Sequence, residues 1–331
     1  SGAEADLFNA TGIVLDDPGA TADTGDGTNA GAIDGYDATD GRNVVIVFYD
    51  VTADASVEAA QTYTNTAVIE NYAGQDGGEN HAANRPSDDA DVRVDNVEVT
   101  KSIVSTSEAH TTLVGGTERV TIGEIVRYQV QVALPEGSLT GLQVRDVLPS
   151  GLTFIDDGTA TVNFISDGVG ITSTAVTSGV LPDSAISRSS SGENDNYDTG
   201  RDVFFKLGDI DNNDRDTNIE YAVIEFNVLV DNNNVSGSAR NDAGESRYND
   251  VFVYTNGSVI YDMPQANRPQ VIIAEPLVQN INKAGSISTG DAGDSITYTV
   301  TFDVATGNNR SDAFNVRLLD TLPSDMTLGA I

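Results

Sequence analysis

The stretch GEIVRYQVQVALPEGSLTGLQVRDVLPSGLTF, residues 123–154, decides the fold. Its first half alternates apolar and polar residues, as a strand with one face in a core does, and the apolar positions are Val126, Tyr128, Val130 and Val132. Two turns follow, and the second half places on one side Leu142, Val144, Asp146 and Leu148. Asp146 is therefore predicted on an apolar face, where an unpaired carboxylate is costly.

The same pattern returns near the C-terminus, in residues 293–328. Asp320 takes the place of Asp146 there, and the residues predicted to point inward are Ile296, Tyr298, Val300 and Phe302. Other segments repeat as well: residues 43–51 match residues 221–230, and both read as buried strands. The spacings agree, because Lys283 lies 182 positions after Lys101 and Asn249 lies 184 positions after Asn65. The repeat is thus about the size of one domain.

The phase of the repeat divides the chain into three parts. Residues 91–272 hold one complete copy, residues 1–90 the back half of a copy, and residues 273–331 the front half of another. Short strands separated by turns rich in Gly, Asn and Asp, without an amphipathic helix, favour Ig-like β-sandwiches. We therefore expect an all-β chain of tandem Ig-like β-sandwich repeats that are out of frame with the chain ends.

Composition excludes several classes of function. The net charge of -34, from 17 Lys and Arg against 51 Asp and Glu, argues against nucleic acid or an anionic membrane surface as a partner. There is no Cys and there are only two His, so thiolate chemistry is excluded and a Ser-His-Asp triad is not expected. The sequence contains no run of about 20 apolar residues, so we expect no membrane insertion in this segment. We expect that the protein is not an enzyme, and at most forms an isopeptide bond between its own side chains.

Three polar residues of the complete copy are predicted on apolar strand faces. Lys101 shares its face with Val97, Val99 and Ile103, Asn249 shares its face with Val251 and Val253, and Asp146 is the third. Burial lowers the pKa of a lysine and raises that of an aspartate, which favours a neutral amine beside a protonated acid. Such an amine attacks an asparagine side chain, releases ammonia and leaves an isopeptide bond.

The motif order resembles known bacterial and archaeal surface repeats. KSI, GEIVRYQVQV, RDVLPSGLTF and NDVFVYTNG are similar to the motifs of the DUF-eleven repeats and the related fimbrial isopeptide-forming domains. The resemblance implies that Lys101, Asp146 and Asn249 form a crosslink, with Lys283, Asp320 and Asn65 as the corresponding set in the two half copies. Asp250 departs from the pattern, which has a small residue there. The alternative is a buried, hydrogen-bonded Lys-Asp pair without a bond.

A second candidate site is a calcium loop. DIDNNDRDTNIE places oxygen ligands at Asp209, Asp211, Asn213 and Glu220 with the spacing of a calcium-binding loop. Strands flank the loop and Asp214 replaces the usual glycine, so it is not an EF-hand. Residues 23–40 are a weaker candidate for calcium. The alternative in each case is a solvated acidic loop.

These patterns predict a structural segment of an extracellular surface stalk, filament or adhesin. The half copies are completed either by further residues of a longer chain or by a second copy of this one, in a head-to-tail fibre. The alternative function is a binding module that recognises a glycan or a host protein through its loops. Its modest candidates are Tyr197 and Tyr261.

Overall fold

The computed structural model describes residues 7–10, 12–15, 33, 35, 44–75, 77–111, 114–168, 170–187, 202–216, 218–232 and 241–329. Strands β1 to β19 and two short 3-10 turns make up the regular structure of these residues. The chain separates into two units, residues 1–54 with 61–93 and residues 55–60 with 94–331, and each is described by itself. Within the described part, no helix has the length and apolar character that a membrane crossing requires.

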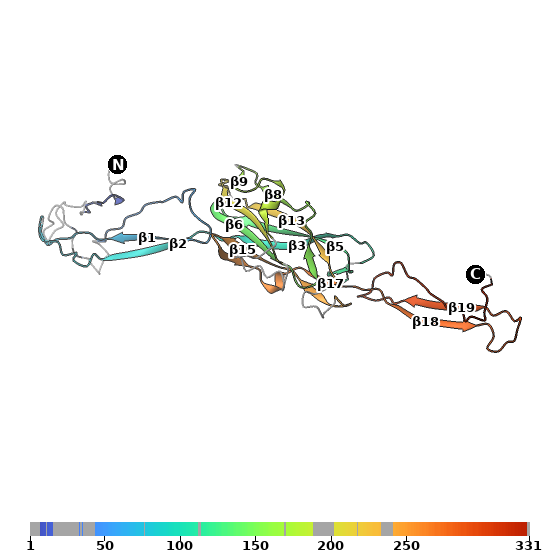
Figure 1. Ribbon diagram of the computed structural model, residues 1–331. Helices are drawn as coiled ribbons and strands as arrows, with labels where there is room; N and C mark the ends of the chain where they lie inside the picture. The colour runs from blue at the N-terminus through green and yellow to red at the C-terminus, as the bar shows by residue number, and fades with distance from the viewer. Residues whose placement is uncertain are drawn as a thin grey trace. The chain divides into compact units, whose positions relative to one another are not determined.

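The second unit contains a sandwich of two antiparallel sheets (Figure 1). One sheet runs in the order β10-β8-β13-β5-β3 with β7 on β13, and its strands are β3 Glu98–Thr106, β5 Ile125–Leu134, β7 Leu152–Phe154, β8 Thr161–Ile165, β10 Gly179–Val180 and β13 Glu220–Val230. The other runs in the order β11-β12-β6-β15-β16 with β9 on β12, and its strands are β6 Gly137–Val147, β9 Ile171–Ser173, β11 Ile186–Ser187, β12 Val203–Asn212, β15 Asp250–Thr255 and β16 Ser258–Asp262. A small third sheet joins β14 Ser246–Tyr248, β17 Gln270–Ile273 and β4 Glu118–Val120. The predicted Ig-like sandwich is confirmed.

The core lies between the two sheets and follows the predicted alternation. On β5 every second residue is buried, and on β6 the buried side chains are Leu139, Leu142, Val144 and Asp146. The change of parity between Leu139 and Leu142 occurs at Gly141, whose φ of 60° is left-handed. Phe226 of β13 packs its ring 5.0 Å from that of Phe205 and 6.0 Å from that of Tyr128.

In the C-terminal part of the second unit, the repeated strand motif of residues 293–328 is exposed rather than covered by a second sheet. There β18 Val278–Gly285 pairs with β19 Tyr298–Val304, yet Tyr298 is 40% and Phe302 41% exposed. The expectation that these residues point into a core is therefore wrong for this half copy. The physical reason is that an apolar strand face is buried only where a second layer covers it, and no such layer packs on it among residues 277–329.

The first unit corrects another expectation. Here β1 Thr62–Val68 pairs with β2 Ser87–Arg93, and both strands are exposed. Residues 44–51, predicted with Asn43 as a buried strand, form no strand and are exposed; Asn43 itself lies outside the described residues. The matching strand β13 of the complete copy is buried because it lies between β5 and β8 and faces the second sheet.

Candidate functional site

Strands of both sheets bring Lys101, Asp146 and Asn249 into one buried place. Lys101 lies on β3 and faces the core, and Asp146 lies on β6 of the opposite sheet. Asn249 immediately precedes β15, whose Val251 is paired with Asp146. The side chains of Lys101 and Asp146 are fully buried, and Asn249 is 0% exposed. The lysine therefore bridges the two layers of the sandwich.

The lysine amine has two oxygen partners. Lys101 Nζ forms a hydrogen-bonded ion pair with Asp146 Oδ2 and donates to the main-chain oxygen of Asp250 at 2.7 Å. It also lies 5.6 Å from the centre of the Tyr128 ring. Because Asp250 is the next residue after Asn249, these contacts hold the amine against the backbone that carries the asparagine.

The amide of Asn249 is buried without a hydrogen-bond partner. Neither its Oδ1 nor its Nδ2 has one, and Oδ1 of Asp146 is also unpartnered. The main chain of Asn249, in contrast, is fixed, since its N–H donates to the carbonyl of Pro269 at 3.1 Å. A buried polar atom without a partner costs about 1–3 kcal/mol, so native proteins seldom keep three at one place. Packing alone gives no reason for a polar residue at this position.

Burial moves the pKa values of the pair toward each other. It raises the pKa of Asp146 to about 6, against the lowering effect of the Lys101 charge and hydrogen bond. The Asn249 amide adds a smaller lowering effect, although it is not aligned for a hydrogen bond. Burial also lowers the pKa of Lys101, against the raising effects of Asp146 and Asp250. A neutral amine beside a protonated acid is therefore brought closer in energy to the ion pair.

A second Lys-Asp pair lies in the C-terminal half copy. Lys283 Nζ of β18 donates to both carboxylate oxygens of Asp320, at 2.7 and 2.6 Å, and lies 4.5 Å from the centre of the Tyr298 ring. These two side chains are 39% and 40% exposed. Of the three lysines in the chain, two thus occupy this position of the repeat. Asn65, the third member of the predicted set, lies on β1 of the other unit, is exposed, and donates to the Tyr49 hydroxyl at 2.6 Å.

The predicted calcium ligands do not gather as one set. Asp209 accepts from the Gly141 N–H and Asp211 from the Ser138 hydroxyl, while Asn213 is exposed. Buried Glu220 instead belongs to an acidic group whose carboxylate oxygens lie within 4.8 Å of one another, namely Asp167, Asp214, Asp216 and Glu220. The sequence signal for this group was the spacing of the last three acids along one hairpin. Residues 23–40 lie outside the described residues, except for positions 33 and 35.

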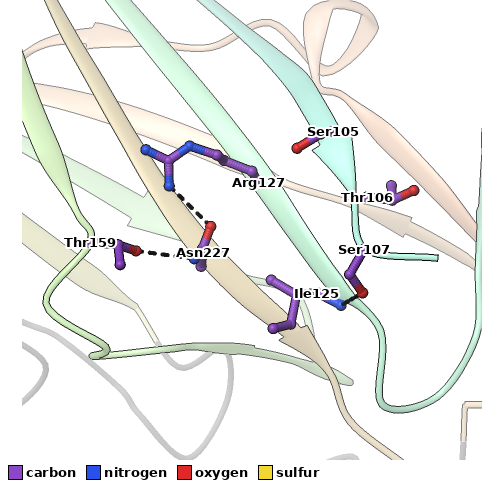
Figure 2. A pocket seen from close by; sticks show the side chains of 7 residues that line it. All are labelled: Ser105, Thr106, Ser107, Ile125, Arg127, Thr159 and Asn227. Carbon is purple, nitrogen blue, oxygen red and sulfur yellow. Dashed lines mark hydrogen bonds between the residues drawn. The ribbon is translucent and has the colours of Figure 1, made fainter.

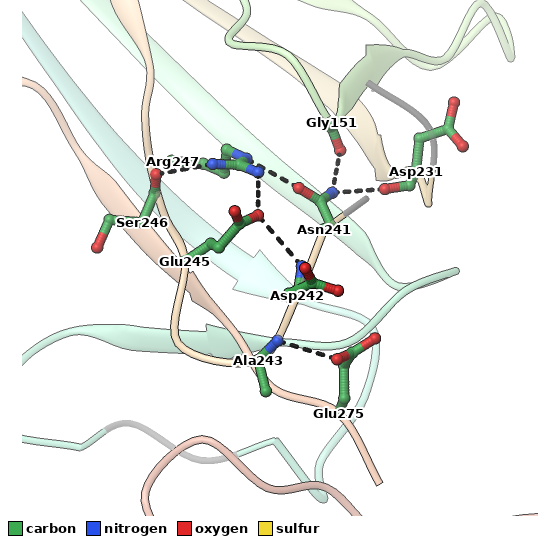
Figure 3. A network of polar contacts seen from close by, with 9 residues as sticks. All are labelled: Gly151, Asp231, Asn241, Asp242, Ala243, Glu245, Ser246, Arg247 and Glu275. Atoms are coloured by element: carbon green, nitrogen blue, oxygen red, sulfur yellow. Dashed lines mark hydrogen bonds and ion pairs between the residues drawn. The ribbon is translucent and has the colours of Figure 1, made fainter. Parts of the chain in front are cut away.

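A polar network fixes the chain just before Asn249 (Figure 3). Fully buried Asn241 donates to the carbonyl oxygens of Gly151 and Asp231, and its Oδ1 accepts from Arg247 Nε at 2.8 Å. Gly151, with φ of 91°, leaves no room for a Cβ, which would come within 2.3 Å of the Asn241 side chain. These hydrogen bonds of Asn241 fix the path of the chain into β14 and β15.

The candidates for a binding module are less developed. A shallow pocket is lined by Ser105, Thr106, Ser107, Ile125, Arg127, Thr159 and Asn227 (Figure 2). Arg127 already donates to Asn227 Oδ1 and pairs with Glu225 at 2.9 Å, so its charge is engaged. Tyr261 is half-buried and donates its hydroxyl to the Val99 carbonyl at 3.1 Å, and Tyr197 lies outside the described residues. Where the structure describes the chain, Tyr261 and the residues lining this pocket form no aromatic recognition patch.

Comparison with known proteins adds only slight likenesses. No protein-family model and no curated protein sequence matches the chain, so the resemblance to DUF-eleven repeats stays a prediction. Among solved structures, the chain is similar to the collagen-binding domain of the surface protein RspB of Erysipelothrix rhusiopathiae, at 8% identity, 65% of this chain, 57% of that chain and a TM-score of 0.29. It is also similar to the pilus protein RrgB of Streptococcus pneumoniae, at 11% identity, covering 67% of this chain and 35% of that chain with a TM-score of 0.30. A variant of the major pilin BcpA of Bacillus cereus matches at 11% identity, covering 75% of this chain and 62% of that chain with a TM-score of 0.29. The chain spans less than two thirds of each, and likenesses this slight assign no function.

Proposed function

We propose that this chain is a structural segment of an extracellular surface fibre, stalk or adhesin, and that an isopeptide bond between Lys101 and Asn249 closes its sandwich. The observation that carries the proposal is the buried Asn249 amide without hydrogen-bond partners beside the buried Lys101–Asp146 pair. The bond would join β3 of one sheet to Asn249, the residue immediately before β15 of the other sheet. In a chain without Cys, such a bond supplies the covalent reinforcement that disulfides give elsewhere.

The chemistry is a condensation that needs no cofactor. Neutral Lys101 Nζ attacks Cγ of Asn249, and the new C–N bond forms as Asp146 passes a proton from the amine to the amide nitrogen. The old C–N bond breaks, ammonia leaves, and Asp146 ends protonated as it began. The buried site favours these steps because it excludes water and brings the neutral forms of both groups within reach.

Intact mass measures this reaction directly. The folded wild-type chain is expected to be lighter than its sequence by one ammonia, and peptide mapping should join Lys101 to Asn249. Lys101→Arg and Asn249→Ala should keep the full mass, with Lys206→Arg as the matched control that keeps the loss. Unmodified Lys101 and Asn249 peptides from folded wild-type protein would refute the bond.

We further propose that the two half copies complete each other. The exposed Lys283–Asp320 pair occupies the positions of the buried pair in the repeat, and Asn65 is the residue that corresponds to Asn249. A second copy could bring Asn65 to Lys283 and build a head-to-tail fibre; further residues of a longer chain would serve equally. Denaturant-resistant ladders of the 331-residue chain, joined through Lys283 and Asn65, would establish the fibre. A monodisperse monomer would exclude it for this chain.

Calcium binding stays a proposal as well. The carboxylates of the acidic group that contains Glu220 lie close enough to repel one another, and a hard cation would relieve that repulsion. Chelator at matched ionic strength is then expected to lower the melting temperature of the wild-type chain. Asp167→Asn should remove this sensitivity if the acidic group binds the ion, and Asp209→Asn should remove it if the predicted loop does, whereas Glu220 belongs to both sets. Equal melting with and without chelator would refute both.

A further inference from the structure

A second carboxylate, that of Asp250, lies beside the proposed crosslink. Asp250 is only 8% exposed, and its main-chain oxygen accepts the hydrogen bond from Lys101 Nζ. Its carboxylate Oδ1 accepts from the N–H of Val251 at 2.8 Å, and Oδ2 lies 2.6 Å from a guanidinium nitrogen of Arg268. The residue that holds the amine is thus itself held by an ion pair.

The segment that carries Arg268 also braces the neighbouring residues. The carbonyl of Pro269 accepts from the N–H of Asn249, and the N–H of Met263 donates to the carbonyl of Val251 at 3.2 Å. Arg268 bends back onto its own segment, because its Nε and Nη2 donate to the Met263 carbonyl at 3.4 and 3.3 Å, and Nη2 is also the nitrogen that pairs with Asp250. Residues 263–269 therefore fix the backbone on both sides of Asp250.

We propose that Asp250 and Arg268 are positioning residues for the Lys101–Asn249 reaction. Arg268 holds Asp250 so that its carbonyl receives the amine, and it offsets the Asp250 charge, which would otherwise keep Lys101 protonated. This inference rests on the proposed isopeptide bond and deepens it. Neither residue exchanges a proton or forms a bond, so the balance of the reaction is unchanged.

The charges around Lys101 set the direction of the effect. Asp146 faces it from β6, Asp250 from β15 and the uncharged Tyr128 ring from β5, while Arg268 lies behind Asp250 with Asp262 3.9 Å away. The charge of Asp250 raises the pKa of Lys101 and that of Arg268 lowers it. The reactive neutral pair and the ion pair contain the same number of protons, so their ratio depends on the difference between the two pKa values. Each unit by which the Lys101 pKa rises lowers the reactive fraction about tenfold.

The repeat shows that this acid belongs to the complete copy. In the N-terminal half copy, Thr66 follows Asn65 where Asp250 follows Asn249. Arg85 takes the place of Arg268 and pairs with Glu70 instead. An arginine is thus present in both copies, but only the complete copy places an acid between it and the lysine.

Refolding kinetics test the proposal on the full chain. Protein recovered unfolded is refolded by dilution, and ammonia loss is followed by intact mass. Arg268→Gln is expected to slow the loss about tenfold for each unit by which the Lys101 pKa rises. Asp250→Asn added to Arg268→Gln should restore the wild-type rate, because it removes the charge that Arg268 offsets. The matched control is Arg127→Gln, which breaks a half-buried pair of the same domain that does not contact Lys101 and should leave the rate unchanged.

A second readout separates electrostatics from packing. In the Asn249→Ala background, which cannot react, the titration of Lys101 is followed by NMR of carbon-labelled lysine; the chain has only three lysines. Arg268→Gln should raise the Lys101 pKa and Asp250→Asn should reverse that rise. A double variant as slow as Arg268→Gln alone, or an unmoved titration, would overturn the inference while the bond itself stands. A wild-type chain that never loses ammonia would refute the bond and the positioning role together.

Discussion

The chain holds two Lys-Asp pairs built from one motif, and they differ in what covers them. The side chains of Lys101 and Asp146 are fully buried, whereas those of Lys283 and Asp320 are 39% and 40% exposed. Each lysine lies over a tyrosine ring of the neighbouring strand, at 5.6 and 4.5 Å. The strand motif alone is therefore sufficient to form the pair.

The burial of the pair, rather than the contact between lysine and aspartate, shifts the pKa values on which the proposed reaction depends. Burial is the first cause of the raised pKa of Asp146 and of the lowered pKa of Lys101. An exposed pair keeps its hydration and is screened by salt, so it is worth only about 0–1 kcal/mol. The C-terminal pair is thus a natural control for the buried one.

The largest expected effect comes from Asp146→Ala. It should abolish ammonia loss, because no group then relays the proton, and leave Lys101 buried without its counter-charge. Removing one partner of a buried pair costs about 3–5 kcal/mol, in addition to the lost crosslink. Denaturant unfolding of the sandwich, with intact mass on the same sample, measures both. A variant within about 1 kcal/mol of wild type would show that burial adds nothing to the pair.

Asn249→Ala should have the next largest effect, because it removes the bond and keeps the ion pair. A crosslink between residues as distant as 101 and 249 is worth about 5 kcal/mol in the chain-entropy treatment of disulfides. The loss should be smaller than this value, since the variant also removes the unpartnered side-chain oxygen of Asn249, which stays in the isopeptide bond. Equal stability of the variant and the wild type would count against a closed loop.

The pH dependence of the uncrosslinked sandwich follows with a smaller effect. In the Asn249→Ala background, which loses the small lowering effect of the Asn249 amide, the folded pKa of Asp146 should be no lower than the value of about 6 in the wild-type chain, and so lies above the ordinary unfolded value of about 3.9. Between these values the folded state binds more protons, so the contribution of this group is complete below about pH 4 and is lost as the pH rises toward 6, by roughly 3 kcal/mol in all.

The control for this titration is Asp146→Asn in the same background. Other buried carboxylates titrate in both proteins, so the difference between their two stability profiles isolates Asp146. Parallel profiles from pH 4 to 6 would show that the raised pKa of Asp146 is absent in solution.

Much of the sandwich was predictable because one face of each strand is buried. The alternation around Tyr128 and Leu142 predicted two strands with one buried face each, and the faces that Lys101 and Asn249 share with valines placed both residues inward. What the sequence alone could not predict depends on cover and on distant neighbours. Residues 44–51 have the pattern of a buried strand, yet no second layer covers them among the described residues.

The site shows the same limit. Asp250 stood out in the sequence only as a departure from the resembling motif, and Arg268 was not singled out as a site residue. Their pairing joins residues 18 positions apart through the loop that precedes β17. The acidic group around Asp214 likewise needed the fold, because Asp167 comes from the loop between β8 and β9. Strand alternation predicts which face a side chain occupies, whereas partners across the layers come only from the three-dimensional arrangement.

The smallest expected effect comes from Asp320→Ala, the counterpart of Asp146→Ala in the exposed pair. Lys283 keeps its hydration when its partner is removed, so no charge is left buried, and the change in stability should be below about 1 kcal/mol. Added salt should reduce this small change further, since ions screen exposed charges but hardly reach a buried pair. Denaturant unfolding of the full chain at low and high salt makes the measurement, with Asp146→Ala run in parallel. A loss from Asp320→Ala as large as that from Asp146→Ala would mean that the C-terminal pair is covered in solution, as a second copy seated on β18 and β19 would cover it.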